Sequence, residues 1–425
     1  MGGQQVRESA HPMWPVVVGI LPIILGASIL MLGNSLLGIT VALKLNGAGV
    51  SQIIIGLSMT GYFAGFMVGA IYGKRLIARV GHIRTYAGLA AIASTAILAH
   101  ALKFDPWFWI GLRVIAGICM AGLFTAMESW LNDRSTNETR GQIVTIHMSS
   151  YFLALCLGQL LVNFWDLSGN KTFVFAAMLA TLSLVPVTLG RMPSPSVESV
   201  APMSPLDVFR FSPLAATGAA MGGLMTSPMY GLSAVFAQDI GFSVFQVSLF
   251  TGAMLFGPFL LLWPLGRLSD RLGRRTALAI ALCGGLAVSS VFLLAGWGGA
   301  LPFWAFLALA MVQGGVVISV YPTSISLAYD RVPRESYVPA AGAMLLFSSL
   351  GSMTGPLIAS TAMATVGPYG LYIHIGTISA LLLAFVCYRA AHRPPVPEEQ
   401  RREFVTVAPT TRAGAELDPR LQAND

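Results

Sequence analysis

The sequence predicts an all-α membrane protein in which twelve transmembrane helices form two pseudo-symmetric six-helix bundles. Of its 425 residues, 55% are hydrophobic and only 10% are charged, and the mean hydropathy is +0.72. Soluble domains carry about one quarter charged residues, so a water-soluble core does not account for this composition. The apolar residues form runs of roughly 20 residues, the length of a bilayer crossing, and the basic residues gather in alternate loops between the runs.

Charged residues and clusters of Pro and Gly separate the apolar runs and so define the expected crossings. The first six crossings are expected at residues 15–43, 50–72, 83–102, 106–130, 142–164 and 171–190. The second six are expected at residues 212–237, 244–265, 276–296, 301–327, 337–365 and 369–389. The chain therefore divides into one bundle over residues 15–190 and another over residues 212–389.

The distribution of Lys and Arg predicts the orientation of the chain. With the amino terminus inside, 21 of the 25 basic residues lie in the termini and loops of one face. The other face carries Lys44, Lys103 and Lys171, and Arg113 lies inside a crossing. Since cytoplasmic loops carry the excess of Lys and Arg, we expect a multi-pass protein of the cytoplasmic (inner) membrane with both termini in the cytoplasm. The formal charge of +7 thus reflects topology and not a nucleic-acid partner.

Three segments lie outside the two bundles. Residues 1–14 are expected to form a cytoplasmic amino terminus, and residues 191–211 are rich in proline and serine, which is typical of a linker between two halves. Residues 390–425 mix prolines with charges of both signs and are expected to form a disordered cytoplasmic tail. Near the end of the linker, the N-cap and first turn of a short amphipathic helix are expected at Ser204, Pro205 and Asp207.

Two loops at equivalent places in the halves repeat a charged motif. The loop after the eighth run, residues 266–275, contains the glycines and charged residues Gly266, Arg267, Asp270, Arg271, Gly273, Arg274 and Arg275. An acid among arginines can form ion pairs between antiparallel helices, and glycine permits a tight turn. In the loop after the second run, Arg79 and Gly81 match Arg271 and Gly273, but Ala78 replaces the acid. Together with a second matching pair of loops, after the fourth and tenth runs, this repetition predicts a duplicated six-helix unit with substrate between the halves.

Over residues 15–389 the chain resembles the major facilitator superfamily, because residues 266–275 match the signature loop of that family at its expected place. Residues 128–132, Glu-Ser-Trp-Leu-Asn, followed by Arg140 and Gly141, resemble more narrowly a bacterial YcaD-like branch. The resemblance implies the major facilitator fold and alternating access by rocking of two bundles. It also implies that the signature loop is a charge latch on one conformational state. Because Ala78 is not acidic, Glu128 is the candidate acid of the first latch.

Two charged residues lie inside predicted crossings. Arg113 is about two turns into the fourth run, where an arginine costs roughly 2.5–3.5 kcal/mol on insertion scales and faces a wet cavity or a partner. Arg113 also resembles the helix-four arginine of the family, which implies a place near the transport path; a structural, snorkelling arginine is the alternative. Glu128 lies fifteen residues later, about 22 Å along the helix, so the two cannot pair. Glu128 is expected either to pair with Arg79 or Arg84 or to carry protons.

Other polar residues at membrane depth are candidates for the substrate or coupling path. They are Asn34, Tyr62, His147, Tyr151, Gln159, Gln313 and Tyr321. Tyr151 and Gln159 are eight residues apart and therefore share one helix face, where they could line a cavity. His147 titrates in the physiological range and could carry a proton, although a hydrogen-bonded histidine at a helix end explains it as well. Hydrogen bonds between helices are the alternative for the others.

The eleventh run contains a small-residue pattern. Gly351 and Gly355 are four residues apart, and Pro356 follows. Small residues at this spacing let a neighbouring helix approach closely, and the proline can kink its own helix.

These features predict a secondary active transporter of a small organic solute, coupled to protons and favouring efflux. No nucleotide-binding loop of the Gly-x-x-x-x-Gly-Lys-Ser/Thr type is present, so energy would come from a gradient. The mostly neutral and aromatic candidates favour a neutral, weakly charged or amphipathic solute. A nutrient symporter or uniporter of the same fold is one alternative, and a membrane sensor without turnover is another.

No enzyme activity, cofactor or metal site is expected. No cluster of His, Asp and Glu and no nucleophile motif lies at either membrane face. The four cysteines fall in different runs without the spacing of metal ligands. The expected partners are a small-molecule substrate, protons and the lipid bilayer, with no nucleic acid, and the protein is expected to be a monomer.

Overall fold

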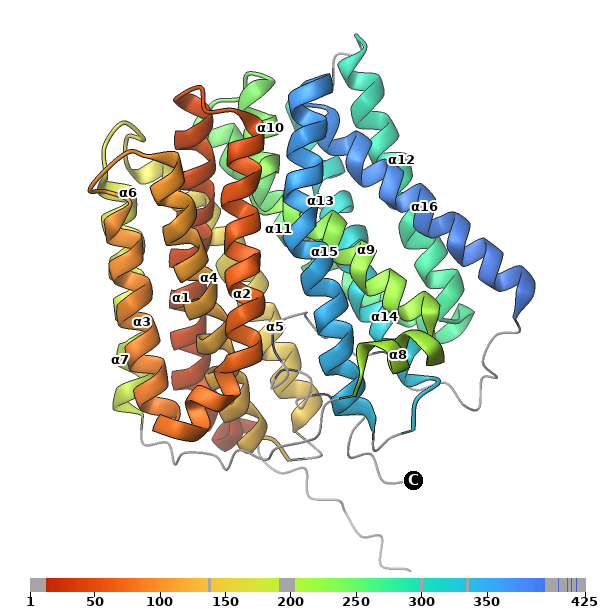
Figure 1. The fold of residues 1–425 in the computed structure, drawn as a ribbon, viewed down its shortest axis with the longest axis horizontal. Helices are drawn as coiled ribbons and strands as arrows, with labels where there is room; N and C mark the ends of the chain where they lie inside the picture. Colours follow the sequence, from red (N-terminus) through yellow and green to blue (C-terminus); the bar gives the residue numbers. More distant parts are fainter. Residues whose placement is uncertain are drawn as a thin grey trace, which may run out of the picture.

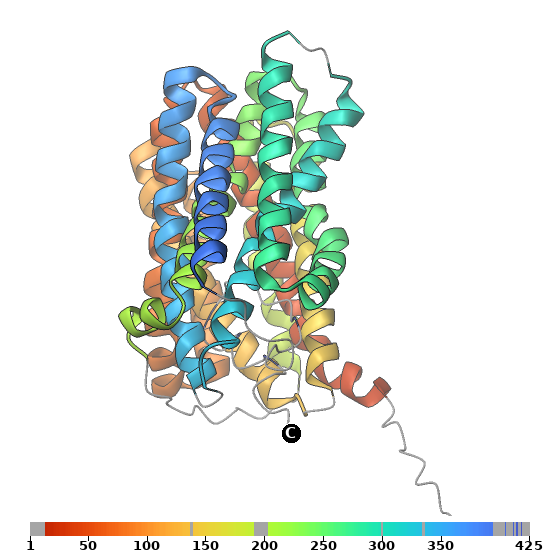
Figure 2. The same ribbon diagram turned by 90° about the vertical axis from the view of Figure 1, so that its right-hand side faces the viewer.

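The computed structural model describes residues 13–136, 139–190, 203–298, 301–333 and 336–393, together with Phe404, Thr411, Gly414 and Asp418. All regular structure within this part of the chain is helical, which confirms the predicted fold class. The helices form two groups that lie side by side, and the short helix α8 (Pro205–Phe211) lies near one end of the second group (Figure 1, Figure 2).

The helices of the first half are α1 (Met13–Gly47), α2 (Gln52–Val80), α3 (His82–Ala99), α4 (Pro106–Asp133), α5 (Arg140–Leu160), the 3-10 turn η1 (Leu161–Phe164), α6 (Lys171–Leu182) and α7 (Leu184–Leu189). Those of the second half are α9 (Pro213–Met229), α10 (Leu232–Asp239), α11 (Val244–Leu272), α12 (Arg274–Gly296), α13 (Phe303–Ile318), α14 (Val320–Tyr329), α15 (Tyr337–Val366) and α16 (Gly370–His392). In the described residues, ten spans are long and apolar enough to cross a membrane, with α5–η1, α6–α7 and α13–α14 each counted as one. The remaining two predicted crossings correspond to α3 and to α9 with α10.

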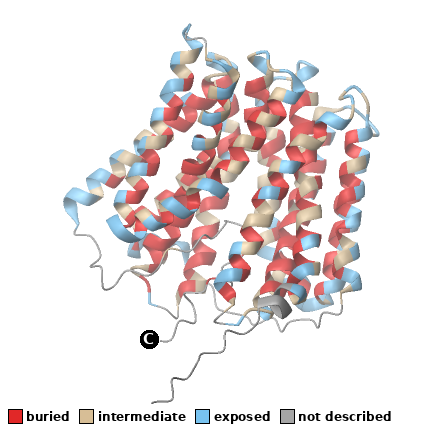
Figure 3. Ribbon diagram, turned by 180° about the vertical axis from the view of Figure 1, so that it is seen from behind, coloured by how far each residue is buried: buried red, intermediate tan, exposed pale blue. Residues whose placement is uncertain are grey.

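Burial follows the pattern expected of a membrane bundle. Buried residues fill the interior of each half, and exposed residues lie at the ends and on the outer surfaces (Figure 3). Many of the exposed residues are large and apolar, among them Ile92, Trp263, Leu294 and Leu381. We call the end at which α1 begins and α16 ends the terminal face, and the opposite end the far face.

Three crossings predicted as continuous helices are interrupted. The sixth breaks at Ser183 and the tenth at Ser319, and a proline follows three residues later in both cases, Pro186 and Pro322. A proline lacks the N–H that would bond the carbonyl four residues earlier, and its ring clashes with that carbonyl. Helices α6 and α13 therefore end at the residue four positions before the proline. The seventh crossing breaks at Tyr230 and Gly231, two residues after Pro228.

The two latch loops are shorter than the sequence predicts. Helix α2 continues to Val80 and α11 continues to Leu272, so a single glycine makes each turn. These are Gly81, with φ of 86°, and Gly273, with φ of 89°, a conformation that glycine adopts without steric cost. Gly266, expected to take part in the turn, lies inside α11 instead. The shared turn at the aligned glycines agrees with the duplication inferred from the sequence.

Among the described helices, α4, α8 and α11 begin with side-chain caps, and at the start of α11 Ser243 Oγ accepts a hydrogen bond from the Gln246 amide. Ser204 Oγ accepts a hydrogen bond from the Leu206 amide at 3.3 Å, and Pro205 follows as the first helical residue, as expected for α8. At the start of α4, Asp105 accepts from the amides of Trp107 and Phe108. The Lys103 ammonium and the Phe108 amide hold the pKa of Asp105 below its usual value.

Candidate functional site

A cavity of about 150 Å³ lies between the two halves. Its walls come from α1, α2, α4 and α5 of the first half and from α9, α11, α13, α14 and α15 of the second. Six of the candidate residues line it: Asn34, Tyr62, Arg113, Tyr151, Gln159 and Tyr321. His147 and Gln313 do not, although both are buried.

Arg113 is the one charged side chain among the described residues that line the cavity. It is 7% exposed, and its Cζ lies 4.3 Å from the centroid of the Tyr62 ring, a cation–π contact. The Tyr62 hydroxyl in turn accepts a hydrogen bond from Asn34 Nδ2 at 3.3 Å. Arg113 Nη1 has no hydrogen-bond partner within the described part of the chain. The guanidinium is thus held against a ring, and its buried Nη1 is left without a protein acceptor in this part of the chain.

Close packing of α2 against α4 brings Tyr62 and Arg113 together. A Cβ added at Gly117 would lie 2.0 Å from the Tyr62 carbonyl oxygen, and one added at Gly65 would lie 2.1 Å from the Val114 carbonyl oxygen. Only glycine at these positions allows the two backbones to approach so closely. Glycines four residues apart in α2 are a sequence signal from which this close packing could have been predicted.

Six of the aromatic rings that line the cavity form a continuous series, which we call the aromatic wall. In spatial order they are Tyr230, Phe63, Tyr62, Phe66, Phe124 and Tyr151. The centroids of neighbouring rings are 5.3–6.4 Å apart. Tyr230 comes from the second half, at the break between α9 and α10, so the wall crosses the boundary between the halves.

The remaining candidate residues differ in their surroundings. Gln159 Nε2 donates to Ser35 Oγ at 2.7 Å, so Gln159 joins α5 to α1 at the edge of the cavity. Tyr151 lines the cavity on the same helix face, as the spacing predicts. Gln313 Nε2 lies 3.4 Å from Ser289 Oγ and joins α13 to α12. His147 lies about two turns inside α5, not at a helix end, and its Nε2 has no hydrogen-bond partner among the described residues.

Direct contacts between the halves close the far face. Asn46 Nδ2 donates to Asp239 Oδ1 at 2.7 Å, and Gln52 Nε2 donates to Asp239 Oδ2 at 3.0 Å. Helices α2 and α15 lie side by side at the boundary (Figure 1). There, a Cβ added at Gly56 would lie 2.0 Å from Ser360 Oγ. The far ends of the halves are therefore packed against one another.

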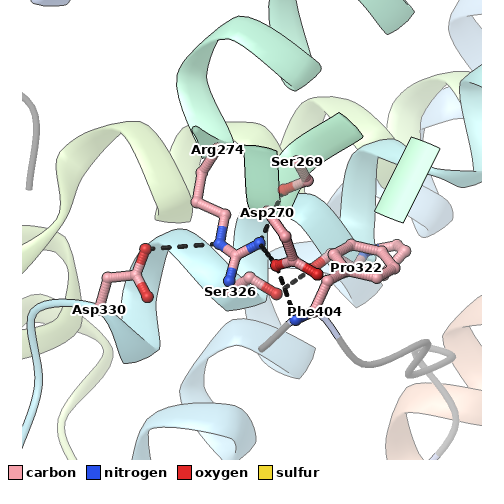
Figure 4. Close-up of polar contacts among 7 residues, drawn as sticks. All are labelled: Ser269, Asp270, Arg274, Pro322, Ser326, Asp330 and Phe404. Carbon is pink, nitrogen blue, oxygen red and sulfur yellow. Dashed lines mark hydrogen bonds and ion pairs between the residues drawn. The ribbon is translucent and has the colours of Figure 1, made fainter. Parts of the chain in front are cut away.

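The signature loop contains a buried ion-pair network (Figure 4). Arg274 Nη1 lies 2.5 Å from Asp270 Oδ1 and donates to Ser269 Oγ at 3.0 Å, and Arg274 Nε lies 3.5 Å from Asp330 Oδ2. The network joins α11 and α12 to the end of α14. In the first half, His82 occupies the position that matches Arg274, and its Nε2 lies 2.9 Å from Ser129 Oγ. The first copy therefore replaces the ion pair with a hydrogen bond.

The other latch candidates lie at the terminal face. Arg275 Nη1 donates to the Arg393 carbonyl at 2.7 Å, while Arg271 and Arg79 are exposed. Glu128 is buried within the last turns of α4.

Residues of the carboxyl-terminal tail contact one acid in each half. The Thr411 hydroxyl donates to Glu128 Oε2, at the end of α4, and Thr411 is 4% exposed. The Phe404 amide donates to Asp270 Oδ1 at 3.0 Å, at the end of α11 (Figure 4). Most of the segment predicted to be disordered, 390–425, lies outside the described residues.

Comparison with known proteins decides the family. The model of the Major Facilitator Superfamily matches residues 23–234 and again residues 214–419. The chain belongs to this superfamily. The two matches correspond to the two halves of the fold, and members of this superfamily are transporters and not enzymes.

Similar proteins agree with that assignment. The uncharacterized MFS-type transporters YcaD of Salmonella enteritidis and Salmonella newport are both 25% identical over 383 residues, covering 88% of this chain and 97% of each relative. They confirm the resemblance to the YcaD-like branch. The nucleoside transporter NupG has a similar structure, with a TM-score of 0.68 at 14% identity, over 88% of this chain and 99% of that one. The human organic anion transporter MFSD10 gives a TM-score of 0.61 at 17% identity, over 88% and 99%.

Proposed function

We propose that this protein is a secondary active transporter of the cytoplasmic membrane that exports a small organic solute by alternating access, coupled to protons. The observation that carries this proposal is the cavity between the halves, with a single buried arginine in its wall. Substrate sites of such transporters lie near the midplane, where the two halves meet. The similar solved structures are named for different cargoes, nucleosides and organic anions, so they do not identify the solute of this protein.

The far-face contacts support alternating access. The polar contacts of Asn46 and Gln52 with Asp239, and the close packing at Gly56, join the halves at the far face. Transport requires these contacts to separate while the terminal ends approach one another. We take the basic terminal face to be cytoplasmic, as the distribution of Lys and Arg predicts, so the closed far face is the one directed away from the cell interior.

Flux measured in proteoliposomes tests the proposal. A thermal-shift screen against metabolites and drugs identifies solutes that stabilise the purified protein. A hit is then expected to show counterflow, and an acid interior is expected to drive its uptake into inverted vesicles, since proton exit would accompany solute entry. Binding without any counterflow would contradict transport and support the sensor alternative.

Glu128 is the proposed proton carrier, because it is a buried carboxyl group within α4. We expect Glu128→Gln to abolish uptake driven by a pH gradient, since the amide cannot exchange a proton, while counterflow at equal pH continues. Size-exclusion profiles check that the variant folds. His147→Gln is the parallel variant, because His147 is the other buried titratable candidate. If His147 carried the proton, this variant would lose the uptake that a pH gradient drives. Unchanged pH-driven uptake in Glu128→Gln would contradict the assignment.

A further inference from the structure

We propose that the cavity binds an amphipathic organic monoanion, with its carboxylate on Arg113 and its apolar part against the aromatic wall. This inference rests on the proposed transport function and names the chemical class of the cargo. It is carried by the charge of the cavity and the chemistry of its lining.

The cavity carries one positive charge and no compensating acid. Arginine remains protonated in proteins, and no Asp or Glu is among the described residues that line the cavity. The Arg113 side chain is more than nine-tenths buried, and its Nη1 has no hydrogen-bond partner in the described part of the chain. A buried charge without a partner is costly, so an anionic ligand supplies what the protein lacks. The planar guanidinium fits a carboxylate through paired N–H···O bonds.

The rest of the lining restricts the ligand further. From Tyr62, which lies against the guanidinium, the aromatic wall continues to Phe63 on one side and to Phe66 on the other. An apolar or aromatic body attached to the carboxylate would lie against these rings. Because only one cation lines the described cavity, a second negative charge on the ligand would remain unpaired. An organic cation would be repelled by the Arg113 charge. Dianions and cations are therefore both disfavoured relative to a monoanion.

Four probes of similar shape and different charge test the inference on purified wild-type protein. They are 4-phenylbutyrate, its neutral amide, 4-phenylbutylamine and the dianion 2-(2-phenylethyl)malonate, compared by titration calorimetry with a series of aliphatic monocarboxylates. We expect the monoanion to bind at least about tenfold more tightly than the other three probes. Equal binding of the amide and the carboxylate, or no binding of any monocarboxylate, would overturn the inference.

Variants test whether Arg113 is the source of the preference for a negatively charged ligand. Arg113→Gln is expected to remove the preference for the carboxylate over the amide, and Arg113→Lys to retain part of it. Lys171→Gln removes one positive charge from an exposed site at the far face and is expected to leave the preference unchanged. Charge-selective binding without counterflow would refute transport and leave the anion site intact, so the two failures are distinguishable.

A separate observation carries a second inference: we infer that the carboxyl-terminal tail restrains the halves at the terminal face. Phe404 contacts Asp270 in the second half, and Thr411 contacts Glu128 in the first. A Cβ added at Gly266 would lie 2.4 Å from Phe404 Cδ1, so the ring packs directly on α11. Phe404 and Thr411 are seven positions apart, so the chain between them spans at most about 25 Å when extended. The tail therefore limits how far the ends of α4 and α11 can separate.

Full-length point variants test this restraint. We expect Thr411→Val, which lacks the donor to Glu128, to raise the rate of counterflow several-fold, and Thr411→Ser, which keeps the hydroxyl, to behave like the wild type. Phe404→Pro, which lacks the amide donor to Asp270, is expected to act like Thr411→Val, with Phe404→Leu as its control. Unchanged or slower counterflow in both Thr411→Val and Phe404→Pro would overturn the inference.

Discussion

Replacing Gly56 by leucine is expected to reduce transport roughly 100-fold by preventing closure of the far face. A Cβ at this position would lie 2.0 Å from Ser360 Oγ and 2.8 Å from the Pro356 carbonyl oxygen. The serine side chain can rotate, but the proline carbonyl belongs to the backbone of α15. Overpacking of this kind costs about 3 kcal/mol, which corresponds to about a 100-fold change in the population of the closed state.

Two measurements separate this effect from misfolding. Gly88→Leu is the matched control, because a Cβ at Gly88 meets nothing within 4 Å, and it is expected to transport normally. A single cysteine at Ser227, which lines the cavity, in a background without the four native cysteines, reports access from the far face. Gly56→Leu is expected to increase its labelling by an impermeant maleimide added on that side. Normal flux, or lost flux without increased labelling, would show that far-face closure does not depend on this contact.

Sequence reasoning located the charged and polar part of the cavity because those residues have few alternatives in a membrane helix. Arg113, Asn34, Tyr62 and Tyr151 lie in crossings where contact with lipid is costly, so they were expected to face the interior, and all four line the cavity. Gln313 also avoids contact with lipid, but its side chain faces a neighbouring helix of its own half and not the cavity. Periodicity alone does not distinguish a cavity from a contact between helices.

The apolar part of the site could not be predicted in the same way. Phe63, Phe66 and Phe124 line the cavity, yet an aromatic ring in a membrane helix is equally stable against lipid, so the sequence carries no penalty that reveals its direction. The helix breaks at Ser183 and Ser319 could have been found from the prolines that follow. The contacts of the tail depend on long-range packing, for which the sequence offers no periodic signal.

The small-residue patterns show what this kind of motif predicts and what it does not. Gly351 was expected to allow close helix approach, and a Cβ there would lie 1.9 Å from the Ala220 carbonyl oxygen of α9. The same spacing in α2, at Gly61, Gly65 and Gly69, determines how α4 presents Arg113. A pattern of small residues thus predicts that two helices pack closely, whereas the identity of the partner helix comes from the three-dimensional structure.

Replacing Arg274 by glutamine is expected to destabilise the protein by about 3–5 kcal/mol, the largest stability effect in the signature loop. The Arg274 and Asp330 side chains are each 2% exposed, and the Nε of one lies 3.5 Å from the Oδ2 of the other. Removal of the arginine leaves the Asp330 carboxylate buried with one cation fewer, and desolvation of that charge makes the loss large. Melting of the purified variants in detergent, followed by intrinsic fluorescence, measures the effect.

The double variant Arg274→Gln with Asp330→Asn distinguishes an ion pair from simple packing. Because it removes both charges, we expect it to be more stable than Arg274→Gln alone, which the sum of independent effects would not give. Arg271→Gln, an exposed neighbour in the same loop, is expected to change stability by less than about 0.5 kcal/mol. If the double variant is no more stable than Arg274→Gln, the network holds the loop by shape and not by charge. The neutral His82–Ser129 contact would then be equivalent to it in the first half, and the two latches would differ in chemistry but not in strength.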